Sequence, residues 1–431
     1  MARAFRSIFF WLHLTAGVVA GLIILVMAVT GVIMTYERQF LEWVDGYEVS
    51  AAGQKADDIS LEKLLGRMPD HAVAGPPASG LVVLAEEGAA VAVQLGREKQ
   101  VFLHPDSGDL LGEGSPGLRA FFKFVLGVHR WLGAQGEYKD LGGNITKAAN
   151  VAFLGLMISG VFLWWPKHWT WRAVHMRTTM NFRIHGKARN WNWHHALGFW
   201  SLIPLGLIAL TGLIMSYTWA NDLLYTLTGT QPPPPRAAPA PPQQQQPGGG
   251  GPRGGGGGGS GGERGPGRGA TGPGSGPATA SATASVSAGA PGGTTPVTTA
   301  APAPAWPGLD AAWKLAAAKV DGWQSIQVRL PDKPGAPATF GITTSHRGRP
   351  DHRSQLSVDL KTGKETVWET FASYNTGRQL RMWSRWLHTG EAGGWIGQTL
   401  AGLASLAAAL LVWTGLALTW RRFVKKKVKV V

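Results

Sequence analysis

Four of the 12 histidines in this chain lie at or near the entrance of a long apolar segment. They are His13, His129, His194 and His388. An imidazole beside membrane-embedded helix is costly unless it is paired or bound to a metal, so four at matching places indicate a function. Because a neutral imidazole nitrogen is a good axial ligand for iron, this placement predicts metal ligation by pairs of histidines.

The apolar segments predict a membrane protein. Each is at least as long as the roughly 20 residues that a membrane-spanning helix needs. They lie near residues 8–36, 146–165, 196–219 and 395–420. The first follows Arg3 and Arg6, as a signal peptide would, but its apolar run is too long for one, so we expect a retained anchor.

Basic residues predict the orientation of these spans. Residues 167–192 contain six Lys and Arg and no acid, and residues 421–431 are also basic. By the positive-inside rule, both segments and the N-terminus are cytoplasmic, which leaves 37–145 and 220–394 outside. These flanking cations account for much of the net charge of +15, so no nucleic acid is expected. The absence of cysteine excludes disulfides and thiolate metal sites within this chain.

The chain contains an internal repeat. Residues 30–36 and 211–217 close the first and third spans with one pattern, and the same offset places His13 on His194. The second and fourth spans match at a small dipeptide before a Trp-containing exit, Ser159-Gly160 and Thr414-Gly415. The repeated unit is therefore a span, an external domain, an interfacial helix with a histidine, and a second span.

The external segments have the pattern of two small α+β modules, each a helix followed by strands, and residues 231–305 have a Pro/Gly-rich composition that cannot bury a core. We expect that stretch to be a disordered linker. The expected division is a transmembrane helix (1–36), an external module (37–117), an interfacial helix (118–133), an external loop with the second transmembrane helix (134–165), a basic cytoplasmic loop (166–192), a third transmembrane helix (193–219), an external segment with the linker (220–305), a second external module (306–377), a second interfacial helix (378–390), a fourth transmembrane helix (391–420) and a basic tail (421–431).

The four histidines are expected at two depths. His13 and His194 open spans that enter from the cytoplasm, whereas His129 and His388 precede spans that enter from outside. A helical bundle can place side chains from facing helices on either side of a flat macrocycle, so each pair suits bis-histidine haem. No Cys-x-x-Cys-His motif is present, which predicts two non-covalent b haems. His195, beside His194, is the alternative ligand at that position.

A basic cluster in the second external module is a further candidate site. It comprises His346, Arg347, Arg349, His352 and Arg353. The cluster could bind an anionic ferric chelate, and the alternative is an ordinary solvated hairpin.

The His-x-x-x-Gly pattern, the Thr-Gly that ends the span after it, and Leu-His-Thr-Gly before the last span resemble the PepSY-associated transmembrane helix family. Studied members of that family include bacterial inner-membrane ferric-siderophore reductases with two b haems. The resemblance implies that His13 and His194 ligate the cytoplasmic-side haem and that His129 and His388 ligate the external one. The sequence departs from the pattern after His129, where Arg-Trp-Leu-Gly replaces Thr-Gly.

The resemblance implies an oxidoreductase that passes electrons from a cytoplasmic protein or a quinol to a ferric siderophore, or another ferric chelate, outside the cell. Two other classes remain open. One is a haem-free PepSY binding or regulatory protein of the envelope. The other is a metal or siderophore transporter, although the spans contain neither an embedded acid nor a pair of Gly/Pro-broken helices.

Overall fold

The computed structural model describes residues 2–47, 56–68, 76–96, 99–233, 306–333, 336–345 and 349–423. Nearly all of the expected linker and most of the basic tail lie outside these residues. So do His346 and Arg347 of the predicted basic cluster.

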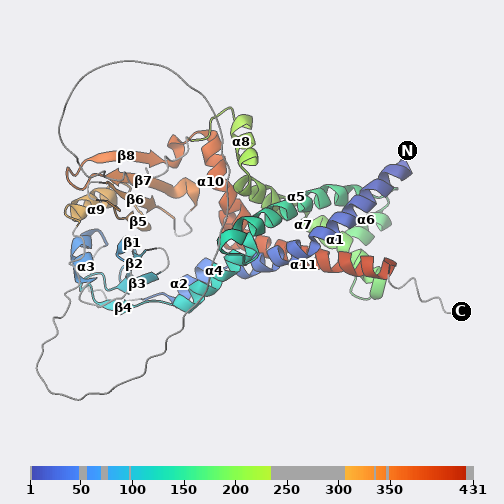
Figure 1. Ribbon diagram of the computed structural model, residues 1–431, viewed down its shortest axis with the longest axis horizontal. Helices are drawn as coiled ribbons and strands as arrows, with labels where there is room; N and C mark the ends of the chain where they lie inside the picture. The colour runs from blue at the N-terminus through green and yellow to red at the C-terminus, as the bar shows by residue number, and fades with distance from the viewer. Residues whose placement is uncertain are drawn as a thin grey trace, which may run out of the picture. The chain divides into compact units, whose positions relative to one another are not determined.

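Four helices are long and apolar enough to cross a membrane, as predicted. They are α1 (Ala2–Met34), α5 (Lys139–Trp164), α7 (Gly186–Ser216) and α11 (Gly394–Phe423). Helix α1 packs against α5 and α11, and α7 also packs against both (Figure 1). Their buried contacts are rich in alanine, including Ala28, Ala404 and Ala408, because small side chains let apolar helices approach closely where lipid provides no hydrophobic drive.

Two amphipathic helices outside the four spanning helices carry His129 and His388 and pack against this bundle. Helix α4 (Pro116–Trp131) packs on α1 and α5, and α10 (Thr376–Thr389) packs on α7 and on the short α8 (Thr218–Leu227). Two further short helices are α2 (Glu37–Val44) and α6 (Trp171–Thr178). A Cβ at Gly142 of α5 would lie against the carbonyl of Trp131, so the absence of a side chain lets α5 approach the end of α4.

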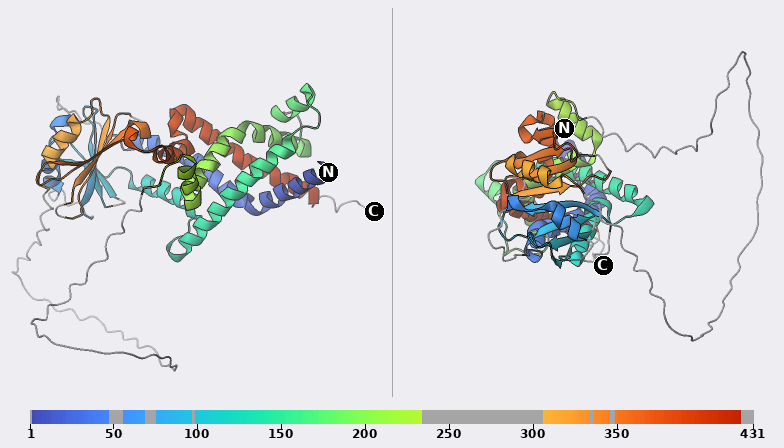
Figure 2. Two further views of the ribbon diagram at one scale, coloured as in Figure 1. Left: turned by 90° about the horizontal axis from the view of Figure 1, so that it is seen from above. Right: turned by 90° about the vertical axis from the view of Figure 1, so that its left-hand side faces the viewer.

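The described residues form one antiparallel sheet of eight strands, four from each of the two segments expected as modules. Its strands are β1 (Ala78–Leu84), β2 (Val91–Leu95), β3 (Lys99–Leu103), β4 (Leu110–Gly112), β5 (Ser325–Arg329), β6 (Ala338–Thr343), β7 (Arg353–Val358) and β8 (Glu365–Thr370). The order β4-β3-β2-β1-β5-β6-β7-β8 joins the two halves at β1 and β5, and Figure 2 shows the blue and orange halves side by side. The sequence pattern predicted the strands but not that the halves share a sheet.

The two halves also share a hydrophobic core. Helix α3 (Leu61–Arg67) and helix α9 (Leu309–Ala318) pack against each other and contribute to it. Trp313 and Phe340 are fully buried in this core. The backbone N–H of Glu62 donates to Asp310, and the backbone N–H of Asp310 donates to Glu62, so each acid binds the first turn of the other helix. The halves therefore stabilise each other.

The pairing of β1 with β5 can be tested by a disulfide, because the chain has no native cysteine. Val82 and Gln327 are opposite each other in register, so the Val82→Cys/Gln327→Cys variant should form a cross-link. With a protease site inserted between the halves, the two fragments should stay joined on a non-reducing gel and separate after reduction. The control pair Val82→Cys/Arg329→Cys is two residues out of register and should cross-link poorly. Equal cross-linking of both variants would contradict the register.

Candidate functional site

The structure brings the four predicted histidines together as two pairs. His13 of α1 faces His194 of α7, with ring centres 6.3 Å apart and planes at 85°. His129 of α4 faces His388 of α10, with ring centres 6.4 Å apart and planes at 71°. We call the first the distal pair and the second the sheet-side pair, because α4 directly follows β4 and α10 follows β8 after one short 3-10 helix. All four residues are half-buried.

Each imidazole is hydrogen-bonded through Nδ1 to a hydroxyl on a neighbouring spanning helix. In the distal pair, the partner of His13 is Ser159 Oγ at 2.9 Å, and the partner of His194 is Thr414 Oγ1 at 2.9 Å. In the sheet-side pair, His129 lies 2.8 Å from Thr30 Oγ1, and His388 lies 3.3 Å from Thr211 Oγ1. Each hydroxyl also donates to the carbonyl four residues earlier in its own helix.

A glycine follows each of these hydroxyl residues, and the imidazole packs against it. We call the four dipeptides the Ser/Thr-Gly motifs: Thr30-Gly31, Ser159-Gly160, Thr211-Gly212 and Thr414-Gly415. A Cβ built at the glycine would lie 3.9, 3.6, 3.2 and 3.5 Å, respectively, from Cε1 of the bonded histidine. The contact is closest at Gly212, which adjoins His388. The motif therefore supplies both a polar partner and room for the ring.

The other ring nitrogen of the four paired histidines, Nε2, has no hydrogen-bond partner among the described residues. Each Nδ1 is bonded to a third helix, not to the helix that bears the facing histidine. Each pair therefore leaves its two Nε2 atoms available for a shared ligand.

His195, the predicted alternative to His194, is placed differently. Its Nδ1 donates to the carbonyl of Trp191 at 2.8 Å, and its ring packs on that indole with centres 4.0 Å apart. Its ring centre is 6.4 Å from that of His194. Helix α7 therefore presents His194, rather than His195, to a Ser/Thr-Gly motif.

The predicted basic cluster is only partly described. Arg349 forms a two-point ion pair with Asp351, with contacts of 2.7 and 3.1 Å, and lies over the ring of Trp383. His352 Nδ1 lies 3.1 Å from Thr344 Oγ1. Partial burial, together with the charges of Arg385 and Arg38, lowers the pKa of Arg353 below its usual value, although the residue as a whole is exposed. Arg353 therefore lies among other guanidinium groups, whereas the charge of Arg349 is compensated.

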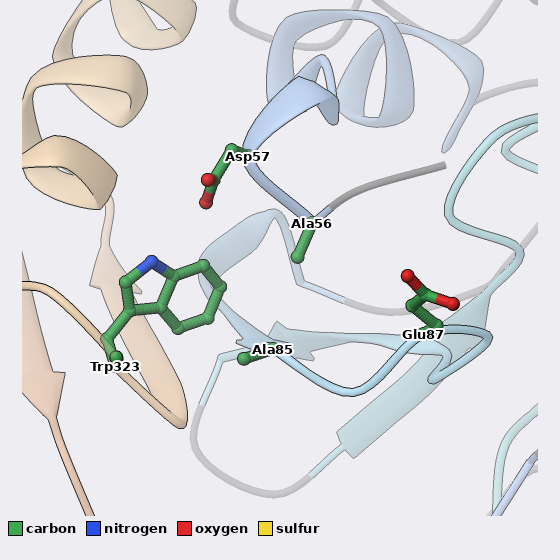
Figure 3. Close-up of a pocket in the computed structure, with 6 residues that line it drawn as sticks. Ala56, Asp57, Ala85, Glu87 and Trp323 are labelled. Carbon is green, nitrogen blue, oxygen red and sulfur yellow. The ribbon is translucent and has the colours of Figure 1, made fainter. Parts of the chain in front are cut away.

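The sheet domain also has a cavity of about 340 Å³ at a separate place. It is lined by Ala56, Asp57, Ala85, Glu87, Gly322 and Trp323. Asp57 lies on the Trp323 side of this cavity and Glu87 on the other (Figure 3). Two carboxylates without a lining cation would repel an anionic ligand.

The chain belongs to the family described as the PepSY-associated TM region, which matches residues 10–422. It is accordingly a membrane protein whose long apolar helices lie in a lipid bilayer. The match includes all four paired histidines and all four Ser/Thr-Gly motifs. No curated protein matches the chain.

Sequence reasoning found the histidines but not their hydroxyl partners. In the sequence these partners stand out only as markers of the repeat: Thr30, Ser159, Thr211 and Thr414. The repetition of these hydroxyl residues was a signal that they matter. It could not show which histidine each one meets, because each hydroxyl lies on a different helix from its histidine. Only the packing of the helices assigns one to the other.

The close contact at Gly212 predicts a specific sensitivity. Gly212→Ala should lower the midpoint of thermal unfolding by several degrees, because the new methyl would lie 3.2 Å from Cε1 of His388 and 3.4 Å from the side-chain nitrogen of Asn150. Gly155→Ala in α5 is the matched control, since a Cβ there has no described atom within 4 Å. Tryptophan fluorescence of the protein in detergent can follow both. Equal midpoints would show that the contact does not constrain the helices.

Proposed function

We propose that this protein is a transmembrane electron-transfer protein with two b haems that reduces a ferric chelate, such as a ferric siderophore, outside the cytoplasm for iron release. The observation that carries the proposal is the spacing of the two histidine pairs. Metal–imidazole bonds of about 2 Å, and a nitrogen about 1 Å from each ring centre, give about 6 Å between the ring centres of two axial ligands. The values of 6.3 and 6.4 Å agree with this spacing.

The set of donor atoms also fits haem better than an isolated metal ion. A structural zinc site takes four protein ligands and a catalytic one takes three. Among the described residues, no group of three or more His, Asp or Glu is placed to hold a metal. Two imidazoles suffice as axial ligands when a porphyrin supplies the other four nitrogens. His13 with His194, and His129 with His388, would hold the two haems, which supply a one-electron couple when bound.

The orientation follows from the charge pattern. Arg421 and Arg422 lie in the last turn of α11, and the basic segment that contains α6 joins α5 to α7. By the positive-inside rule, we infer that these ends are cytoplasmic and that the sheet lies on the other side of a bacterial inner membrane. The distal pair then lies on the side of a cytoplasmic or quinol donor, and the sheet-side pair on the side of the substrate.

The arrangement is further supported by its regularity. Each half of the sheet has four strands, and α4 follows the first half as α10 follows the second. Each repeat of the chain also contributes one histidine to each pair, His13 and His129 from the first and His194 and His388 from the second. We interpret the two halves as PepSY-like modules that arose by duplication, since one duplicated unit accounts for both pairs at once.

Charge suggests where an anionic chelate binds. Arg385 is on α10, three residues before His388, and it is close enough for its charge to lower the pKa of Arg353. Arg38 belongs to the same group, although it also contacts Glu42 and Glu391. The carboxylate-lined cavity is unsuitable for an anion, so we place the substrate at the guanidinium groups beside α10.

The haem proposal is tested by absorbance spectra of the purified protein, reduced minus oxidised, with haem stoichiometry. We expect two low-spin b haems in the wild-type protein. His13→Ala should remove or alter one and His388→Ala the other, because each substitution leaves a single imidazole at its site. His195→Ala is the matched control and should retain both haems, since its ring is bonded to Trp191.

An absence of haem in protein from haem-replete cells would refute the reductase and favour the binding or regulatory protein. Loss of a haem in His195→Ala, with an unaltered spectrum in His194→Ala, would instead exchange the ligand assignment.

The substrate location predicts a charge-dependent effect. Arg385→Gln should raise KM for an anionic ferric chelate by about twofold to fivefold, the change expected for losing a charge interaction worth up to about 1 kcal/mol. Arg349→Gln is the control, because Arg349 is already paired with Asp351. Chelate reduction by protein in liposomes, compared for an anionic and a cationic chelate, measures the effect. Equal changes for both chelates would contradict this location.

A further inference from the structure

We propose that the four Ser/Thr-Gly motifs are positioning elements that fix the tautomer and the rotation of each imidazole, so that Nε2 is presented to the haem iron. This inference rests on the proposed function, and it adds residues that do not themselves touch the cofactor. It concerns Thr30, Ser159, Thr211 and Thr414, together with the glycine that follows each.

The direction of the hydrogen bonds is decided at His388. Its Nδ1 lies 2.8 Å from the backbone carbonyl of Ile208. A carbonyl oxygen can only accept, so Nδ1 must bear the proton. In a neutral imidazole the lone pair then lies on Nε2, which is the atom that a metal requires. Thr211 is the second acceptor of the same N–H, at 3.3 Å.

The other three motifs have the same arrangement. The hydroxyl of Thr30 donates to Val26 O at 2.7 Å, that of Ser159 to Gly155 O at 2.8 Å, and that of Thr414 to Leu410 O at 2.8 Å. A hydroxyl has a single proton, so an oxygen that donates to its own helix can only accept from the imidazole. Each of these histidines is therefore held with Nδ1 protonated.

The glycines determine which way the ring can turn. Cε1 of each histidine lies against the glycine, so the edge of the ring that contains Nδ1 is packed on the neighbouring helix. A ring flipped about its long axis would direct a carbon at the hydroxyl and lose the hydrogen bond. The hydroxyl and the glycine thus act together, which explains why they are adjacent in all four motifs.

Outer hydrogen bonds to a ligating histidine orient the ring and raise its basicity, and their loss typically reduces metal affinity about 10-fold or more. We expect Thr414→Val to weaken haem retention at the distal pair by about 10-fold and to raise the reduction potential of that haem, because a less basic imidazole stabilises ferric iron less. Thr30→Val should do the same at the sheet-side pair alone. Thr211→Val should have a smaller effect, because His388 keeps the carbonyl of Ile208.

The chain offers matched controls. Thr419 is on the same helix as Thr414, and its hydroxyl donates to Gly415 O at 2.9 Å without a hydrogen bond to a described histidine. Ser201 of α7 donates to Leu197 O at 2.6 Å in the same way. Thr419→Val and Ser201→Ala should leave both potentials unchanged. Thr414→Ser keeps the hydroxyl and should preserve the wild-type potential, which separates a lost hydrogen bond from a general packing defect.

The experiment is a redox titration of each haem in the full-length protein in detergent, with haem retention measured alongside. It is paired with nitrogen NMR of ¹⁵N-histidine-labelled protein produced without haem. The NMR should show Nδ1 protonated at the four paired histidines. Thr30→Val and Thr414→Val should perturb the signals of His129 and His194, respectively.

The two measurements distinguish the two proposals. If the wild-type protein binds no haem, the proposed function fails, while the NMR of the same protein still tests the tautomer. If two haems bind but Thr30→Val and Thr414→Val match Thr419→Val in potential, retention and histidine signals, the motifs are not positioning elements. A proton on Nε2 of the paired histidines in the haem-free protein would also overturn the inference.

Discussion

The hydrogen bond between an imidazole Nδ1 and a hydroxyl on another helix is the constraint on which the bundle depends. Within a bilayer, an unpaired polar group is costly and apolar side chains give little preference for one helix register over another. The bonds of His13 to α5, His194 to α11, His129 to α1 and His388 to α7 each join two helices at a defined height. They therefore align the helices and orient the rings at once.

The common sheet has the corresponding role outside the bundle. The pairing of β1 with β5 unites strands from distant parts of the chain, and the acids Glu62 and Asp310 join the helices that share its core. Helices α4 and α10 follow the last strand of each half, so this sheet constrains where both begin. The position of His129 opposite His388 thus depends on the sheet as well as on the bundle. Each half of the sheet alone would fix the start of only one of the two helices, α4 or α10.

The regular parts of this protein were predictable because their signals are local. Apolar runs of this length are typical of membrane-spanning helices, and the repeat of His13 and His194 identified equivalent histidines without any structure. The helices α4 and α10 were also expected, at residues 118–133 and 378–390. The prediction was incomplete for the external modules, because strand alternation reports burial on one face and says nothing about which edge strand pairs with which.

The sequence by itself determined the number of spans, the family and the identity of the four paired histidines, since composition, length and repetition are properties of the chain. Only the tertiary structure decided which hydroxyl meets which imidazole, that His195 turns to Trp191 instead of a Ser/Thr-Gly motif, and that the two halves share one sheet. The physical reason is the same in each case. These contacts join segments that are far apart in the chain, and their geometry depends on helix register and strand pairing, which no local pattern specifies.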